Sequence, residues 1–546
     1  MSLSRYYHTL RYLKPRQFYR RLWHRLYQPQ PDMSSPPALR EKKDSWIIPC
    51  KRKPSIYGID KFNFLNQKHV ISNSESWYNK NIDKLWLYNL HYFDDLNASD
   101  SASRKIWHRE LLDRWVEENP PVSDTGWEPY PTSLRIVNWI KWALTGNELG
   151  SECIQSLAIQ TRWLAKRLEY HLLGNHLFAN AKALLFAGLF FDGEEADNWF
   201  SKGLAILGLQ ISEQILKDGG QFERSTMYHA LALEDMLDII NLAGTYTGSR
   251  SDELNDLMER NTDSVNNMRH WLDLMCHPDG EISLFNDSAM CIAPSPAELE
   301  RYAHELGFEP ILENNNEIVH LEDSGYVRIK LGAVSALLDV APIGPDYLPG
   351  HAHADTLSFE MSIYSKRVLV NSGTSCYGVS EERLRQRGTS AHNTVVINGQ
   401  NSSEVWSGFR VARRAKPFGL AICREAESVS VKCSHDGYHR LSGKPTHTRK
   451  WEVTQDKITI MDQLDGKWET ASAYFYFHPD IKIERIDAGE CIHIYCQNKQ
   501  ITFEAINANI RIMDSSYHPE FGVSIPNQCI CLEFLESHVV TTLNWE

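Results

Sequence analysis

Residues 350–371 read GHAHADTLSFEMSIYSKRVLVN, and residues 387–398 follow with RGTSAHNTVVIN. Apolar and β-branched residues at 357–364 and 367–370 flank a short Ser-Lys turn, which predicts two paired strands. Further short β-branched or aromatic stretches occur at 326–330, 334–340, 427–432, 447–454, 457–463, 472–477 and 492–503. Short strands separated by turn signals predict an antiparallel β-sandwich that starts near residue 318.

The sequence upstream of residue 318 has a helical spacing of apolar residues. Residues 177–191 read LFANAKALLFAGLFF, a nearly uninterrupted apolar run that predicts a buried helix. Similar helical periodicity occurs at 154–168, 204–216 and 229–243. Successive helices with short joints predict a helical bundle or toroid over residues 85–317. We therefore expect an α+β multidomain chain with a β-domain at 318–546.

The whole chain restricts the class of partner. Its 546 residues exceed what one hydrophobic core normally serves, so two or more domains are expected. A formal net charge of −13 argues against nucleic-acid binding, which needs a basic surface. An acidic protein that binds an anionic polymer would need a local basic cleft. Eleven cysteines without a CxxC spacing favour a reducing compartment.

The N-terminal stretch is basic and aromatic. Residues 4–28 read SRYYHTLRYLKPRQFYRRLWHRLYQ and lack the apolar segment of a signal peptide. A cytoplasmic location is therefore expected, with a periplasmic or surface-associated one left open. We predict a basic helix packed on its own protein or a partner, with peripheral membrane contact as the alternative. Residues 30–55 predict a loose linker, so residues 1–84 lead into the helical domain.

Two polar motifs interrupt the apolar helical region. Gly174-Asn175-His176 precedes the buried helix, where Asn175 would serve either as an N-cap or as a functional amide. The second motif is QFERSTMYH at 221–229. Arg224 and Tyr228 would share a helix face, and an adjacent Arg lowers a Tyr pKa, which suits proton transfer. The alternative for Tyr228 is a buried hydroxyl with a structural hydrogen bond.

Two further polar motifs precede the predicted strands. In extended geometry His351, His353 and Asp355 would face the same side. His392 precedes another strand, and Asn371 follows the strands at 357–370. A histidine from each of two neighbouring strand starts plus an oxygen ligand predicts a divalent-metal site, with a solvated loop as the alternative.

Together these motifs resemble the heparinase II/III superfamily of polysaccharide lyases. The run at 351–378 and the later R…GTSAHNTVVING resemble its β-domain signature, while GNH and QFERSTMYH resemble its helical catalytic segments. The resemblance covers roughly residues 85–480. It implies an incomplete (α/α) toroid followed by a β-sandwich. WLYNLHYF at 86–93 also resembles members associated with surface-polysaccharide production.

The resemblance implies β-elimination on an acidic, uronate-containing polysaccharide, and it assigns roles to the motif residues. Asn175 would neutralise the uronate carboxylate, with His392 as a second candidate for this role. Tyr228 would be the base, the acid or both, and His351 would be its partner on the opposite wall. Orientation or substrate contact would involve His176, Glu223, Arg224, Trp127, Tyr130, Arg135, Trp406 and Arg410. For the aromatic members of this set, the alternative is ordinary core packing.

The resemblance also implies a structural metal, zinc or calcium, held by His353, Asn371 and His392. Asn371 departs from the acidic residue common at this position, and a neutral amide is a weaker ligand, which puts zinc in doubt.

Two other functions remain open. One is a non-catalytic glycan-binding or assembly protein of surface-polysaccharide biosynthesis. The other is a toroid glycoside hydrolase, which needs two carboxylic acids facing the scissile bond. Glu128, Glu223 and Asp287 are candidates, although no two of them stand in a recognisable acid/base context.

Overall fold

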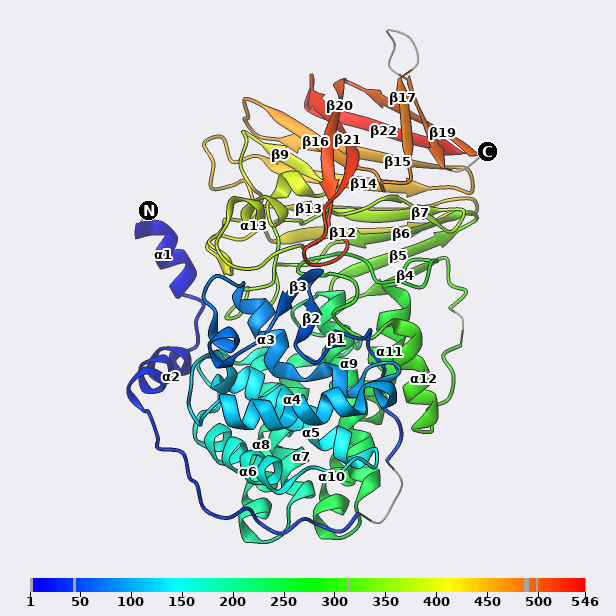
Figure 1. Ribbon diagram of the computed structural model, residues 1–546. Coiled ribbons are helices and arrows are strands. Elements are labelled where there is room, and N and C mark those ends of the chain that lie inside the picture. The colour runs from blue at the N-terminus through cyan, green and yellow to red at the C-terminus, as the bar shows by residue number, and fades with distance from the viewer. Residues whose placement is uncertain (1–2, 43–45, 313, 486–490, 497–498, 546) are drawn as a thin grey trace.

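The computed structural model describes residues 3–42, 46–312, 314–485, 491–496 and 499–545. A helical domain lies beneath a β-domain, and the N-terminal helices lie along one side of their junction (Figure 1). This is the expected fold class, an incomplete (α/α) toroid followed by an antiparallel β-sandwich. No helix in the described part of the chain combines the length and apolar character needed to cross a membrane.

The helical domain is built around buried helices. α7 is buried along most of its length, as its apolar sequence predicts. It lies close to α8: a Cβ added at Gly188 would lie 2.7 Å from the backbone nitrogen of Phe200. The helices are α3 (Lys84–Tyr92), α4 (Lys105–Glu118), α5 (Pro129–Leu144), α6 (Ser151–Lys166), α7 (Gly174–Phe190), α8 (Glu194–Gln214), α9 (Thr226–Thr245), α10 (Ser249–Glu259), α11 (Thr262–Leu274) and α12 (Pro296–Glu305).

The β-domain contains three larger antiparallel sheets with a shared apolar core. Five strands form the sheet nearest the helices (Figure 1), β4 (Ile318–Leu321), β5 (Tyr326–Leu331), β6 (Val334–Asp339), β7 (Phe359–Ile363) and β8 (Lys366–Leu369). Eight strands form the largest sheet, in the order β12 (Pro417–Arg424), β13 (Val429–His435), β14 (Thr446–Val453), β15 (Lys457–Asp465), β22 (His538–Trp545), β19 (Lys499–Ile506), β18 (Cys491–Cys496) and β17 (Lys482–Arg485).

A four-stranded sheet and shorter elements complete the β-domain. The four strands are, in order, β20 (Ala508–Tyr517), β21 (Ile525–Phe534), β16 (Ala471–Tyr476) and β9 (Val395–Ile397). β10 (Val405–Trp406) pairs with β11 (Arg410–Val411), and α13 (Glu381–Gln386) precedes β9. The single strand predicted at 492–503 is two paired strands, β18 and β19, and residues 497–498 between them lie outside the described residues.

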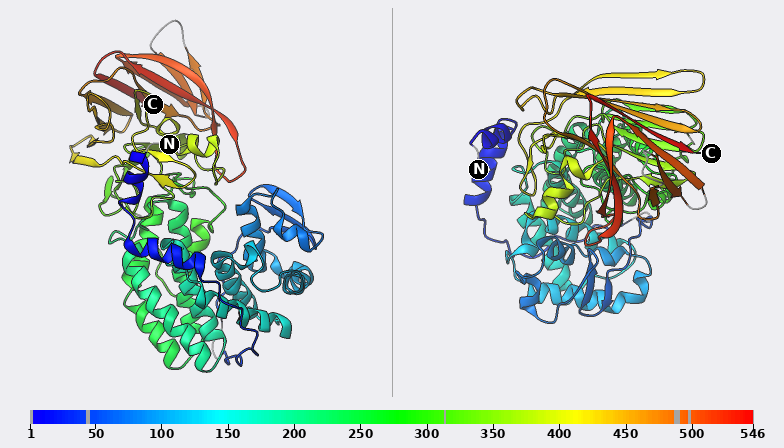
Figure 2. Two further views of the ribbon diagram at one scale, coloured as in Figure 1. Left: turned by 90° about the vertical axis from the view of Figure 1, so that its left-hand side faces the viewer. Right: turned by 90° about the horizontal axis from the view of Figure 1, so that it is seen from above.

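The first 84 residues contain the predicted basic helical stretch and a small sheet that was not predicted. α1 (Leu3–Leu10) and α2 (Pro15–Leu26) lie across the two domains (Figure 2). A three-stranded sheet follows, β1 (Ile56–Gly58), β2 (Lys61–Phe64) and β3 (Gln67–Val70). These strands have only three or four residues, too few to show a clear period in the sequence.

The predicted linker at 30–55 is tied to the helical domain. Arg162 donates hydrogen bonds to the carbonyls of Ser34 and Ser35, and Asn241 bonds both the amide and the carbonyl of Ile47. Residues 43–45 lie outside the described residues. The prediction of a loose segment is therefore wrong, because its backbone groups are paired with side chains of the helices.

Candidate active site

A cavity of about 1010 Å³ lies where the helical domain, the β-domain and the N-terminal segment meet. From the helical domain it is lined by Asn175, His176 and Tyr228, which we call the helical wall. From the β-domain it is lined by His351, Tyr377 and Arg410, which we call the β wall. The motifs therefore converge at the domain junction, where ligand sites are common.

Asn175 lies in the first turn of α7 and is not its N-cap. The N-cap position is Leu173, which makes no side-chain capping bond. Leu173 and Gly174 have φ angles of 70° and 56°, a left-handed turn that is strained for leucine. A Cβ added at Gly174 would lie 2.3 Å from the Cδ2 of Leu348. The turn thus fits closely against the loop that leads to His351, and Asn175 lines the cavity.

Tyr228 occupies the first turn of α9, where Ser225 is the N-cap and accepts a hydrogen bond from the Tyr228 amide. The Tyr228 hydroxyl lies 3.0 Å from the hydroxyl of Tyr377. Burial, together with the neighbouring Tyr377, raises the pKa of Tyr228 well above its usual value. The hydroxyl is therefore protonated at neutral pH.

Arg224 does not accompany Tyr228. It precedes α9 with a φ of 59°, and its Nε donates to the carbonyl of Ser324 at 2.8 Å. The predicted shared helix face, and the lowered Tyr228 pKa that it implied, are both wrong. The reason is that the helix begins at Thr226, after Arg224.

His351 comes from the β wall, as expected, and its ring contacts that of Tyr228 on the helical wall. Their ring centroids are 4.1 Å apart. The His351 Nδ1 lies 2.8 Å from Asp287 Oδ2, which fixes the proton on Nδ1 and leaves Nε2 as the basic atom. Residues 351–358 form a loop and not a strand, yet His351 and His353 still face one carboxylate, because both bond Asp287.

Asp287 is the centre of a buried ionic network. Its Oδ1 accepts from His353 Nε2 at 2.8 Å, and its two oxygens accept a bidentate pair of bonds from Arg383. Although burial disfavours the charged form, Arg383 and the two histidines hold the pKa of Asp287 well below its usual value. Asp287 is thus an anion that orients His351, as a carboxylate orients a catalytic imidazole elsewhere.

Glu223 approaches the other nitrogen of the same ring. Its Oε2 lies 3.8 Å from His351 Nε2 and has no hydrogen-bond partner among the described residues. Burial is the main cause that raises the pKa of Glu223 above its usual value. His351 therefore lies between a firmly ionised carboxylate and one that holds a proton more readily.

His176 and Tyr130 form a second pair on the cavity lining. Their ring centroids are 4.5 Å apart, and His176 Nδ1 lies 3.0 Å from Glu169 Oε1. Burial opposes the charged ring, but Glu169 outweighs it and raises the pKa of His176.

Three predicted substrate contacts lie away from the cavity. Trp127 is buried and donates to the carbonyl of Asn119. Arg135 is buried, with its Nε 2.9 Å from Gln160 Oε1 and its guanidinium over the ring of Trp115. Trp406 donates to Thr9 in α1. The prediction of substrate contact is wrong for these three, because their polar atoms are used in packing; Arg224 is likewise used in backbone contacts.

Arg410, like His176 and Tyr130, is a predicted substrate contact that does line the cavity, and its guanidinium lies 4.8 Å from the Trp406 ring centroid. Sequence reasoning missed two residues at the site. Tyr377 stands inside the quoted β-domain run and carries no separate signal. Arg383 is one of several arginines before His392, and its bond to Asp287 depends on the tertiary fold.

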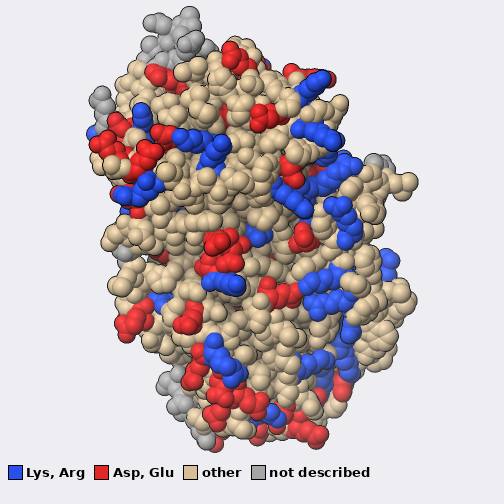
Figure 3. All heavy atoms as spheres, turned by 180° about the vertical axis from the view of Figure 1, so that it is seen from behind, with Lys and Arg blue, Asp and Glu red and all other residues tan. Residues whose placement is uncertain are grey.

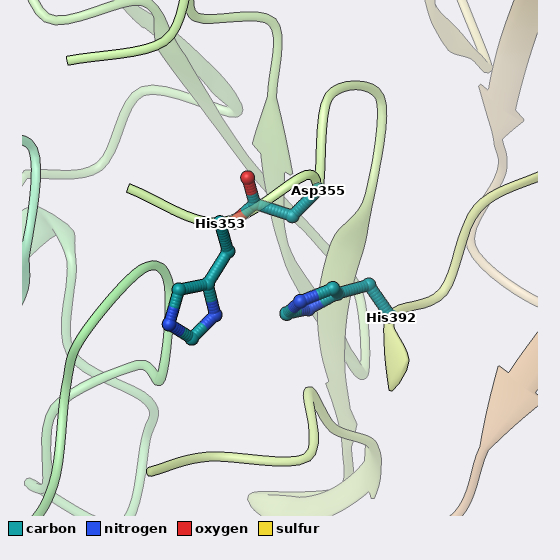
Figure 4. Close-up of side chains that lie close together, drawn as sticks. All are labelled: His353, Asp355 and His392. Atoms are coloured by element: carbon teal, nitrogen blue, oxygen red, sulfur yellow. The ribbon is translucent and has the colours of Figure 1, made fainter. Parts of the chain in front are cut away.

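A cluster of possible metal ligands lies behind the β wall. The ligand atoms of His353, Asp355 and His392 all lie within 4.8 Å of one another (Figure 4). Three buried atoms there have no hydrogen-bond partner in the described part of the chain, His353 Nδ1, His392 Nε2 and Asn371 Nδ2. Burial lowers the pKa of both histidines, so their rings are neutral, as metal ligation requires.

This arrangement fits a divalent ion but changes the predicted ligand set. Asn371 Oδ1 lies 3.1 Å from His392 Nδ1, so Asn371 holds the far side of the His392 ring. Asp355 supplies the carboxylate oxygen that the predicted set of His353, Asn371 and His392 lacked. Asn371 would then act as an outer partner that orients the His392 ring without binding the ion itself.

Three of the seven Lys and Arg side chains that line the cavity are paired with buried carboxylates, and the other four are exposed. Lys141 and Lys182 both bond Asp238, and Arg52 bonds Glu234. The remaining exposed cations on the lining are Arg21, Lys53, Lys84 and Arg410.

Family models give the chain its class. The model described as Heparinase II/III N-terminus matches residues 75–303, and the model described as Heparinase II/III-like, C-terminal matches residues 313–546. Together they cover most of the chain, which therefore belongs to the heparinase II/III family.

Individual relatives agree with this family. A heparin-sulfate lyase of Bacteroides stercoris is 27% identical over 286 residues, which cover 48% of this chain and 41% of that protein. A heparin-sulfate lyase of Pedobacter heparinus is 24% identical over 254 residues, covering 42% of this chain and 36% of that protein. The chain thus spans less than half the length of these curated relatives. A crystal structure of heparinase III has a TM-score of 0.68 at 18% identity and covers 88% of this chain and 79% of its own.

Proposed function

We propose that this protein is a polysaccharide lyase that cleaves a uronate-containing polysaccharide by β-elimination. The observation that carries the proposal is the contact between the rings of Tyr228 and His351, whose centroids lie 4.1 Å apart on a cavity that Asn175 also lines. The names of the relatives, heparin-sulfate lyase, support the same reaction class.

The reaction needs three functions. The carboxylate next to the abstracted proton must be neutralised, and the Asn175 amide on the cavity lining would donate to it. A base must take the proton from the carbon that bears the carboxylate, and the electron pair then forms a double bond while the bond to the 4-linked oxygen breaks. An acid must protonate that leaving oxygen. Each proton transfer typically contributes about 10²–10⁴-fold.

The hydrogen bonds favour one division of these roles. Asp287 keeps the His351 proton on Nδ1, so Nε2 is the base. The raised pKa of Tyr228 keeps its hydroxyl protonated, so Tyr228 is the acid. Tyr377, bonded to the Tyr228 hydroxyl, positions that proton. After elimination, the His351 proton passes to solvent and Tyr228 regains one, which restores the starting state.

We also propose that His353, Asp355 and His392 hold a structural divalent ion. When bound, the ion would fix the two loops that carry the histidines. His353 and His351 both bond Asp287. An ion that fixes the position of His353 would therefore also help to fix Asp287, and through it the base His351.

The paired cations suggest the substrate class. A densely sulfated chain needs many free Lys and Arg side chains. Here the inner Lys141, Lys182 and Arg52 are already bonded to carboxylates, and Asn175 is neutral. We therefore propose a uronate polymer with few sulfates as the preferred substrate.

The hydrolase alternative is weakened by the same geometry. Asp287 is bonded to Arg383 and two histidines, so it has no free oxygen for a sugar. Glu128 bonds Lys84 and Tyr88 at the rim. Glu223 keeps a carboxylate oxygen without a hydrogen-bond partner among the described residues, but a glycoside hydrolase needs two such acids.

The test is ultraviolet absorbance of unsaturated uronate over time, with a panel of sulfated and unsulfated uronate polymers. We expect a rise with an unsulfated polymer, lost in Tyr228→Phe and kept in Tyr246→Phe, a matched buried tyrosine away from the cavity lining. Products without the chromophore would indicate a hydrolase. Binding without any product would indicate the non-catalytic glycan-binding alternative.

A further inference from the structure

α2 presents an apolar face to solvent. Its exposed apolar side chains are Phe18 (49%), Tyr19 (58%), Leu22 (60%), Trp23 (53%) and Leu26 (72%). These positions follow the spacing i, i+1, i+4, i+5 and i+8, which places them on one side of a helix. A helix on the surface of a globular protein normally turns such a face inward.

The opposite face of α2 is polar and is fixed to the protein. Gln17 is buried and its amide donates to the carbonyl of Tyr347. The His24 ring stacks on His171 at 4.1 Å, and Arg167 Nη1 donates to the His24 carbonyl at 2.6 Å. The outward direction of the apolar face is therefore set by specific contacts of its polar side.

Positive charge surrounds the apolar face. Residues 1–31 contain seven Lys and Arg and no Asp or Glu, in a chain whose formal net charge is −13. Exposed Lys166 and Lys202 line a small pocket with Trp23. Lys and Arg gather along the edge of the molecule that carries α1 and α2, on the right in Figure 3.

We propose that α2 binds the surface of an anionic lipid bilayer, with its apolar face inserted among the lipids and its cations at the headgroups. This combination of a basic helix with aromatic and leucine side chains on the other face is what interfacial helices use. An acidic polysaccharide would meet the cations but would leave the leucines in water. A second copy would bring two basic surfaces together, which is electrostatically unfavourable.

α2 lies next to the cavity as well as at the protein surface. Gln17 and Arg21 of α2 line the cavity, together with Leu10 and Leu13. A bilayer that contacts Leu22 and Trp23 would therefore lie beside the cavity. The inference does not depend on the reaction proposed above, because it concerns a different face of the N-terminal segment.

The test uses the full chain and co-sedimentation with vesicles of phosphatidylcholine alone or mixed with phosphatidylglycerol. We expect binding to the mixed vesicles that weakens as salt rises, and much weaker binding to phosphatidylcholine. Leu22→Glu with Trp23→Glu should reduce binding roughly tenfold or more. Ile106→Glu, at an exposed apolar residue on α4, is the matched control and should bind as the parent chain does.

Several outcomes would overturn the proposal. Failure of the parent chain to bind mixed vesicles at low salt is one, and equal binding by the Leu22→Glu, Trp23→Glu chain is another. A parent dimer that this double variant dissociates, without vesicle binding, would assign the face to self-association. Circular dichroism of both variants shows whether the fold is retained, and Arg25→Gln provides a second variant that removes one positive charge and leaves the apolar face intact.

Discussion

The two walls of the cavity position their functional groups by different means. On the helical wall, Asn175 and Tyr228 stand in the first turns of α7 and α9, so the helix backbone itself sets their direction. On the β wall, His351 and Tyr377 stand on long loops outside the strands. The His351 loop is held by bonds to Asp287, which comes from the helical domain. Helical structure positions the side chains of the helical wall, whereas bonds to a buried carboxylate position His351 on the β wall.

The largest effect is expected where the β wall depends on one residue. Asp287→Ala would leave Arg383 buried without its partner and His351 without its orienting carboxylate. We expect a loss of about 3–5 kcal/mol in the free energy of unfolding. We also expect a fall of roughly 10³–10⁴ in the elimination rate.

Denaturant unfolding and ultraviolet rate assays check this prediction. Asp287→Asn is the control of similar shape, and it should retain more stability than Asp287→Ala while still losing activity. Parent-like activity in either variant would show that the network does not position His351.

The helical wall is tested at its strained turn. Gly174→Ala would place a Cβ 2.3 Å from Leu348 at a φ of 56°, so overpacking and backbone strain add. We expect a loss of about 1–3 kcal/mol in stability. Gly244→Ala in α9 has open space at the added Cβ and should be neutral or stabilise by about 0.5–1 kcal/mol. Equal thermal stabilities of the two variants would contradict the close fit at Gly174.

Removal of the metal should affect the β wall, because the proposed ligands lie in the loops behind it. If His353, Asp355 and His392 hold a divalent ion, a chelator should lower the melting temperature by several degrees. Ligand binding to the folded state alone stabilises it by mass action. His392→Ala should melt lower and no longer respond to the chelator. Purified protein without bound metal in elemental analysis would refute the site.

The smallest effect is expected from the Glu169–His176 pair of the helical domain. Glu169 raises the pKa of His176, so this stabilisation is complete below the ordinary histidine pKa and is lost as pH rises through the raised value. Burial opposes ionisation of Glu169, but His176 and Asn180 lower its pKa below the usual value. The contribution of Glu169 is thus lost as pH falls through the lowered value. NMR titration should show a lower His176 pKa in Glu169→Gln; an unchanged pKa would refute the pairing.

Sequence reasoning reached the fold class because its signals are local. The apolar run of α7 and the period of the β-domain strands each lie within a few residues. The motif residues Asn175, Tyr228 and His351, to which the family resemblance assigned roles, also line the cavity.

The remaining features depend on contacts between distant segments. Asp287 was weighed only as an acid for hydrolysis, because nothing near it in sequence indicates bonds to His351 and Arg383. Trp127 and Arg135 were expected at the cavity, yet their partners in the helical core use their polar atoms. The prediction that Arg224 shares a helix face with Tyr228 is wrong for a local reason. Arg224 lies just before α9, the helix that it was expected to join.

The carboxylate of Asp287 connects the helical domain to the β-domain, which restricts how the two domains can evolve. The aspartate precedes α12, whereas His351, His353 and Arg383 all follow β6. Either half made alone would carry buried charges without partners and only part of the reacting groups. Recombination that exchanged one half between distant homologues would have to preserve this single set of bonds. The two segments are therefore expected to evolve as one unit.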